Sequence, residues 1–214
     1  LKNFSDGACL INKYKIKDNF FKLEIKNDST RIDIFEKESL RYSEQLSFGI
    51  NMVFKDVFKI CSLEKEETQK FLVQNLSENR KLNRDEYLEE EYFKKNKFRK
   101  IRKKFIIEII EARFKEIFDV ILYKNINLRS YINNDLLPFV YIEDEILKKN
   151  FEAKIKNNIS KISKHKIEYI NNFDEDFFIS NLANLTAFGW KKEAIPVPKT
   201  KNSIIARIFK SIFR

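Results

Sequence analysis

Residues 19–35 read Asn19-Phe-Phe-Lys-Leu-Glu-Ile-Lys-Asn-Asp-Ser-Thr-Arg-Ile-Asp-Ile-Phe35. Two runs rich in Ile and Phe flank a short polar stretch, Lys26–Thr30, and this is the pattern of a β-hairpin. A third run of this kind, Leu40–Ser47, follows the polar residues Glu36–Ser39. The sequence therefore predicts three consecutive strands, at 19–25, 31–35 and 40–47, joined by two tight turns.

The rest of the body alternates helices with strands. Gly49 is expected to open a helix to about Ile60, and Ser62 to cap a second helix that carries acids in its first turns. The later expected elements are a long helix over 97–124, a buried strand over 136–142, a helix over 143–159, a short strand over 166–170 and a last helix ending near Trp190. This alternation predicts an α/β fold.

The carboxyl-terminal residues 203–214 form an amphipathic pattern, with Ser203 as the expected cap. At about 100° per residue the side chains divide between two faces. One face is apolar and holds Ile204, Ile205, Ile208, Phe209, Ile212 and Phe213; the other holds Arg207, Lys210 and Arg214 beside Ser203 and Ser211. Such a helix is typical of a membrane interface, and it is shorter than the ~20 residues needed to span a bilayer. The alternative is a terminal helix packed on its own domain.

Basic charge is concentrated before and within this helix. Residues 191–214 hold seven basic side chains and one acid, so 7 − 1 = +6 of the formal +10 lies there. Residues 191–202 include Pro196 and Pro198 and have little to bury, which suits an extended tether. We therefore expect the helix to bind an anionic membrane surface. A weak anchor of this kind gains most when several copies are linked, which also predicts self-association.

A second basic stretch lies inside the body. Eight of the eleven residues in Lys94–Lys104 are basic. One interpretation is a phosphate-binding patch, for nucleic acid or lipid. The other is a solvated helix with i,i+4 pairs such as Glu90 with Lys94, and a buried stripe that includes Phe98 and Phe105. Outside the tail the net charge is only 10 − 6 = +4, which argues against a general nucleic-acid binder.

Side chains for catalysis are scarce. His165 is the only histidine, so neither a histidine-based metal site nor a Ser-His-Asp triad can be assembled. Cys9 and Cys61 fit a reducing cytosol and are expected to pack in the core. The sequence thus gives no catalytic constellation and implies no metal.

The order of several short motifs resembles the bacterial cell-division protein FtsA, which is actin-like. These motifs are Ser5–Leu10, the three-strand meander, Leu40–Gly49, Asp56, Ser62–Glu67, Ile109–Phe118, Asn181–Gly189 and the basic amphipathic tail. They correspond to the C-terminal half of that family. Because the chain also begins at Leu1, we expect it to be part of a longer protein.

The resemblance implies the C-terminal lobe of an actin-like, ribonuclease H-like fold followed by an amphipathic helix. Its core would comprise residues 1–74 and 160–190, with a sub-lobe inserted at about 75–159. It further implies polymerisation, capture of the FtsZ C-terminal tail by the sub-lobe, and attachment of FtsZ filaments to the cytoplasmic face of the inner membrane at the division site. Arg113, on the matched helix, is a candidate for the FtsZ-binding surface, or else a plain surface ion pair.

The nucleotide-binding loops depart from the family pattern. The family has a glycine-rich loop after its first strand, whereas this chain has Lys26-Asn-Asp-Ser-Thr30 there. Small residues let backbone N–H groups approach phosphate, and Asp28 adds a negative charge instead. The second family loop falls near Ile142–Glu145, also without glycine. Ser29 and Thr30 keep hydroxyl groups, so ATP binding is possible but doubtful, and we expect no ATPase activity and no required cofactor.

Overall fold

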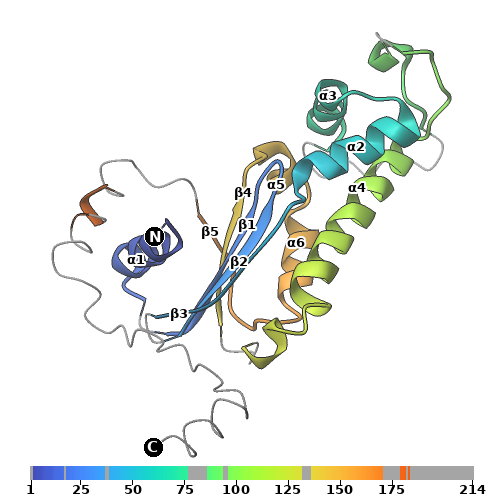
Figure 1. The fold of residues 1–214 in the computed structure, drawn as a ribbon. Coiled ribbons are helices and arrows are strands. Elements are labelled where there is room, and N and C mark those ends of the chain that lie inside the picture. The colour runs from blue at the N-terminus through green and yellow to red at the C-terminus, as the bar shows by residue number, and fades with distance from the viewer. Residues whose placement is uncertain are drawn as a thin grey trace, which may run out of the picture.

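The computed structural model describes residues 2–16, 18–36, 39–76, 86–93, 96–131, 136–170, 179–181 and 183. Its centre is a five-stranded mixed sheet with the order β3-β2-β1-β4-β5 (Figure 1). The three predicted strands are present as β1 (Phe20–Ile25), β2 (Thr30–Glu36) and β3 (Ser39–Leu46), and β2 is antiparallel to both β1 and β3. The strands β4 (Leu137–Ile142) and β5 (Glu168–Tyr169) extend the sheet in parallel with β1.

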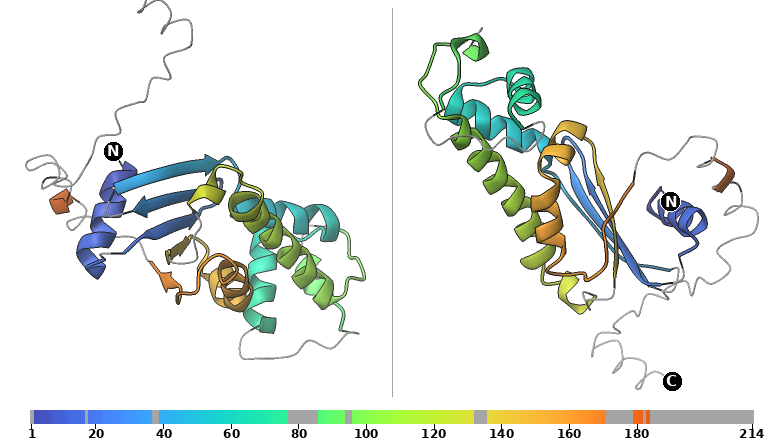
Figure 2. Two further views of the ribbon diagram at one scale, coloured as in Figure 1. Left: turned by 90° about the horizontal axis from the view of Figure 1, so that it is seen from below. Right: turned by 180° about the vertical axis from the view of Figure 1, so that it is seen from behind.

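Helices cover the two faces of the sheet unequally (Figures 1 and 2). On one face lie α2 (Ile50–Cys61), α4 (Lys103–Phe118), α5 (Glu145–Asn150) and α6 (Glu152–Ile159). Farther from the sheet, α3 (Lys65–Leu76) contacts α2, α5 and the 3-10 turn η1 (Glu90–Phe93). The opposite face is covered by α1 (Lys2–Tyr14).

The two faces of the central hairpin are chemically different. Phe21, Leu23 and Ile25 of β1 enter the main core with the helices of the larger layer. Full burial of such a side chain stabilises by roughly 1.5–3 kcal/mol. Toward α1, a smaller core contains Phe20 and Phe35, whose rings stack at a centroid distance of 4.6 Å. The remaining β1 and β2 positions on this second face are charged.

Several predicted element boundaries are wrong. Ser62 does not cap the second helix: it ends α2 in the left-handed conformation, with φ of 58°, and α3 begins at Lys65. The helix expected over 143–159 is divided at Phe151. Helix α1 was not predicted from the sequence.

The helix expected over 97–124 begins later. Residues before Lys103 are extended, because the Leu88 N–H donates to Ile101 O and the Lys103 N–H donates to Glu86 O. The helix then ends at Phe118 and continues as a π-helical turn, η2 (Asp119–Tyr123). The expected buried stripe is therefore only partly formed, since Phe98 and Phe105 are exposed.

Candidate functional site

The β1–β2 turn is fixed by the amino-terminal end of α2. The Ile50 N–H donates to Lys26 O and the Asn51 N–H donates to Asn27 O, each at 2.9 Å. Within the turn, the Lys26 N–H donates to Ser29 O at 2.8 Å. The first N–H groups of a helix otherwise lack partners inside the helix. Here the turn carbonyls accept from two of them.

Gly49 makes this close packing possible. A Cβ at position 49 would lie 2.0 Å from Lys26 O, 2.9 Å from Ser29 N and 3.0 Å from Asn27 O. The φ of Gly49 is −163°, so the backbone conformation itself does not require glycine. The requirement comes from the approach of the turn, and it explains why one of the three glycines in the chain stands here.

A carboxylate from the next parallel strand completes the turn. Glu143 follows β4, and its Oε2 accepts a hydrogen bond from the Asn27 N–H at 2.6 Å. The Glu143 N–H in turn donates to Ile25 O at 3.0 Å. Both loops that the family resemblance singles out, 24–31 and 142–145, are thus adjacent in space, and a protein carboxylate binds the first loop.

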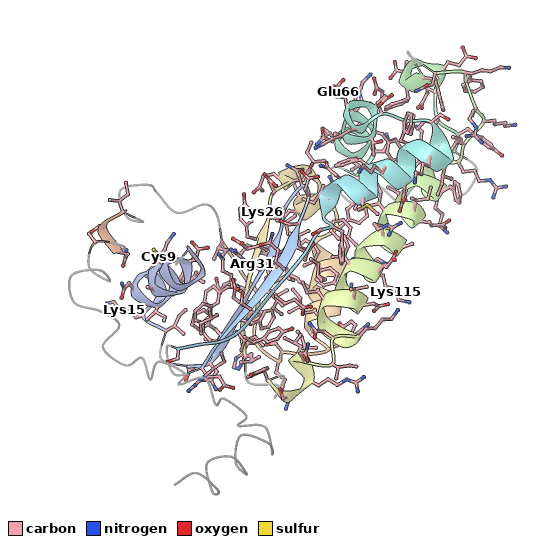
Figure 3. The ribbon with its side chains drawn as sticks, in the orientation of Figure 1. Cys9, Lys15, Lys26, Arg31, Glu66 and Lys115 are labelled. Carbon is pink, nitrogen blue, oxygen red and sulfur yellow. The ribbon has the colours of Figure 1, made fainter. Side chains whose placement is uncertain are left out.

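Beside the turn, charged side chains are buried between the sheet and α1. Lys22 Nζ lies 2.6 Å from Asp6 Oδ2 and 2.8 Å from Glu24 Oε1. Arg31 lies 2.5 Å from Glu24 Oε2, 3.5 Å from Asp6 Oδ2 and 3.2 Å from Asp33 Oδ2. Strand register creates this cluster, because Lys22 is opposite Asp33 and Glu24 is opposite Arg31. We call these five residues the buried ion cluster; Figure 3 labels Arg31 and the nearby Lys26.

Burial and pairing act in opposite directions on the carboxyl groups of the cluster. Burial tends to raise the pKa of Glu24, but Lys22 and Arg31 outweigh it and hold that pKa below its ordinary value. Burial raises the pKa of Asp33, against the hydrogen bond from Ser43 and the charge of Arg31. Buried charges are tolerated only when they are paired in this way.

The residues predicted to bind nucleotide do not form a phosphate cradle. Thr30 is fully buried and its Oγ1 donates to Phe48 O at 2.8 Å. Ser29 gives its carbonyl oxygen to the turn hydrogen bond. Asp28 accepts from Asn51 Nδ2 at 2.8 Å, so a negative charge remains beside the turn. This donor set does not fit a nucleotide phosphate.

The other predicted residues lie apart from this turn. Arg113 of α4 pairs with Asp56 of α2, and its Nη1 lies 2.7 Å from Glu116 Oε2. The structure thus places Arg113 in a helix–helix ion pair, and its contact with a partner stays a prediction. Residues 191–202, predicted as a linker, and 203–214, predicted as a helix with every membrane-binding residue, lie outside the described residues.

The basic stretch 94–104 borders a pocket. The pocket has a volume of about 480 Å³ and is lined by Ile60, Arg99, Lys100, Ile101, Arg102, Lys104, Phe105 and Glu108. The Arg99 guanidinium donates to Ile60 O at 2.9 Å, which joins the stretch to the end of α2. The solvated-helix interpretation is wrong for residues 96–102, which are not helical. Lys94 and Lys95 lie outside the described residues.

The cysteines and the histidine lie in different surroundings. Cys9 and Cys61 are buried, as predicted, and His165 is exposed. In the described part of the chain, no three His, Cys, Asp or Glu side chains are placed to hold a metal ion. No helix there has the length and apolar character to cross a membrane.

Solved structures share this arrangement of sheet and helices. A chain of the PilM–PilN type IV pilus biogenesis complex matches with a TM-score of 0.51 and 11% identity, over 88% of this chain and 50% of that one. MreB 5 of Spiroplasma citri bound to AMPPNP matches with a TM-score of 0.51 and 12% identity, over 86% of this chain and 58% of that one. The fold is actin-like.

These matches confirm the predicted α/β, ribonuclease H-like fold class. At such identities they establish the fold alone, and the chain spans only about half the length of the structures it matches. No protein-family model and no curated relative matches the sequence. The narrower resemblance to FtsA stays a prediction.

Proposed function

We propose that this chain is an FtsA-like cell-division protein that attaches FtsZ filaments to the cytoplasmic face of the inner membrane at the division site. The observation that carries the proposal is an actin-like lobe followed in sequence by residues 203–214, whose side-chain pattern predicts a short cationic amphipathic helix. The lobe supplies a partner-binding and self-associating body, and residues 203–214 supply reversible membrane attachment. Linking several weak anchors through a polymer multiplies their effect without new contacts.

The pocket beside residues 99–108 is the proposed site for the FtsZ tail. Its wall combines apolar groups, Ile60 and Phe105, with exposed cations such as Lys100 and Lys104. An extended acidic peptide with apolar side chains suits this combination, because the apolar groups provide affinity and the charges provide steering. The proposed role is that of a scaffold and not of an ATPase, since the loop glycines are missing.

Membrane attachment is tested by sedimentation of the full chain with vesicles that contain anionic lipid. Phe209→Glu places a charge in the apolar face of the helix and should abolish sedimentation. Ile126→Glu makes the same change at a side chain that is 76% exposed on the body, and should leave sedimentation unchanged. Undiminished binding by the Phe209→Glu variant would contradict the anchor assignment.

Partner binding is tested with a labelled FtsZ C-terminal tail peptide. Lys100→Glu combined with Lys104→Glu should weaken binding by about tenfold or more, because two favourable charges become repulsive. Lys115→Glu, an exposed change on the same helix as Lys104, is the matched control. The alternative function is that of a basic nucleic-acid-binding module. It would be favoured if the peptide does not bind but DNA or RNA does, with an affinity that falls steeply with salt and survives deletion of residues 202–214.

A further inference from the structure

The family resemblance equates the β1–β2 turn with a nucleotide-binding loop, yet the groups around it are already paired within the protein. A nucleotide bound at this turn would bring a phosphate to the turn backbone, and a divalent cation accompanying that phosphate would need oxygen ligands such as the carboxylate of Glu24, the acidic residue of β1 beside the turn. The structure places a protein anion at the first position and protein cations at the second. This disagreement is independent of FtsZ and of the membrane.

The position beside Glu24, where a divalent cation would bind, is deeply buried. Lys22 is 1% exposed, Glu24 8%, Asp6 5% and Asp33 0%. Three carboxylates and two cations leave one net negative charge, which Lys26 offsets from the edge at 3.8 Å from Glu24. Each oxygen of the Glu24 carboxylate faces a cation, with Lys22 on Oε1 and Arg31 on Oε2. A metal ion could reach Glu24 only by displacing one of them.

The position where a phosphate would bind lies at the backbone of the β1–β2 turn. The Asn27 N–H, a donor of the kind that would face a phosphate oxygen, instead donates to the Glu143 carboxylate. The neighbouring α2 amides of Ile50 and Asn51 donate to turn carbonyls. Of these three hydrogen bonds, the one from the Asn27 N–H to the exposed Glu143 carboxylate is charge-assisted, and such bonds are stronger than those between neutral groups.

We propose that this lobe carries its own counter-ions in place of a bound nucleotide and its cation. Lys22 and Arg31 replace the divalent cation at Glu24, and the Glu143 carboxylate replaces a phosphate at Asn27. The turn is therefore held in one conformation without nucleotide, and the conformational state of the lobe does not respond to ATP. Any assembly of the protein then proceeds equally with and without nucleotide.

The first experiment measures thermal unfolding of the full chain with millimolar Mg²⁺–ATP, Mg²⁺–ADP or Mg²⁺ alone. A ligand that binds only the folded state raises the melting temperature by mass action. The expected result is no change with any of the three. A rise that increases with nucleotide concentration overturns the proposal, whether or not the protein binds FtsZ or lipid.

The second experiment removes one internal cation. Lys22 Nζ lies 2.6 Å from Asp6 Oδ2 and 2.8 Å from Glu24 Oε1. Lys22→Ala removes this cation and leaves both carboxylate oxygens facing the vacated position. Ca²⁺ binds carboxylate oxygens at about 2.3–2.6 Å, so the vacated position suits it. The variant should melt at a lower temperature than the wild type and regain stability with millimolar Ca²⁺. Lys26→Ala, which removes a partly exposed cation of the same turn, should show no response to Ca²⁺.

The third experiment keeps the proposal testable if Lys22→Ala fails to fold. Glu143→Gln removes the charge on the acceptor of the Asn27 N–H, and Glu145→Gln makes the same change at an exposed residue in the next helix. Hydrogen exchange at the Asn27 amide should accelerate by about tenfold in the first variant and remain unchanged in the second. Equal protection in the wild type and in Glu143→Gln would show that Glu143 does not hold the turn.

Discussion

Gly49→Ala is expected to separate the β1–β2 turn from α2. The new Cβ would stand 2.0 Å from Lys26 O, and 2.9 and 3.0 Å from two more backbone atoms, all closer than an ordinary van der Waals contact. None of these atoms belongs to a flexible side chain, so the turn must shift as a unit. That shift breaks the hydrogen bonds from the Ile50 and Asn51 amides, both 2.9 Å long.

The size of the effect follows from these contacts. Each lost hydrogen bond contributes about 0.5–1.5 kcal/mol, and more where an N–H is left without a partner. The reduced freedom of the unfolded chain offsets about 0.4–1 kcal/mol. With the steric strain included, we expect a loss of roughly 2–4 kcal/mol in the free energy of unfolding. For a chain of this length that corresponds to a fall of roughly 5–15 °C in melting temperature.

Urea and thermal unfolding measure this change, with Ser47→Ala as a control at an exposed position two residues earlier. The urea midpoint should fall while the slope with denaturant stays constant, since the change concerns stability and not the area exposed on unfolding. A Gly49→Ala protein within about 0.5 kcal/mol of the wild type, the range of ordinary surface changes, would refute the close-packing explanation.

Three further predictions concern other parts of the fold. Burial raises the pKa of both Cys9 and Cys61 to about 11, so the unfolded chain releases these thiol protons from about pH 9, before the folded chain does. The free energy of unfolding should therefore fall between pH 9 and 11. Urea midpoints measured at each pH should show a shallower fall in a Cys9→Ala, Cys61→Ala variant. A double-mutant cycle on Asp56 and Arg113 should give an interaction free energy of about 0.5–1 kcal/mol, because the pair joins two helices but is partly solvated. An interaction free energy of zero would mean that the pair does not stabilise the contact between α2 and α4. Asp144→Ala removes the acceptor of the Leu147 N–H at the start of α5 and should lower the free energy of unfolding by about 1 kcal/mol in urea titrations, an expectation that an unchanged midpoint would contradict.

The strand meander was predictable from sequence because its signals are local. Runs of Ile and Phe broken by short polar turns specify a hairpin wherever it lies in the fold. Gly49 was also correctly placed at the start of α2, although its reason, the contact with Lys26, is not local. By contrast, the start of α4 depends on hydrogen bonds between Leu88 and Ile101 and between Lys103 and Glu86. No propensity within 97–103 reveals those partners, so the predicted helix began too early.

The candidate site was harder to predict because alternation along a strand does not reveal what covers each face. In β1, Lys22 and Glu24 alternate with Phe21 and Leu23, and alone this suggests one solvated face. The structure buries all six β1 residues, since α1 covers the second face and brings Asp6 to the charged positions. A helix that the sequence reading missed thus decides the character of the site.

The buried ion cluster also bears on how the lobe is held together. Asp6 comes from α1, whereas its partners Lys22 and Arg31 come from two strands, so the cluster joins the helix to the sheet near the turn. Farther along the same face, Phe20 and Phe35 stack and α1 contributes Leu10 to the smaller core. Separating one partner of a buried ion pair from the other leaves an uncompensated charge. Paired charges therefore specify the position of α1 on the sheet more sharply than these apolar contacts do. The position of α1 on the sheet is accordingly set by the same side chains that neutralise Glu24, which makes a fixed conformation of this face the expected consequence of the sequence.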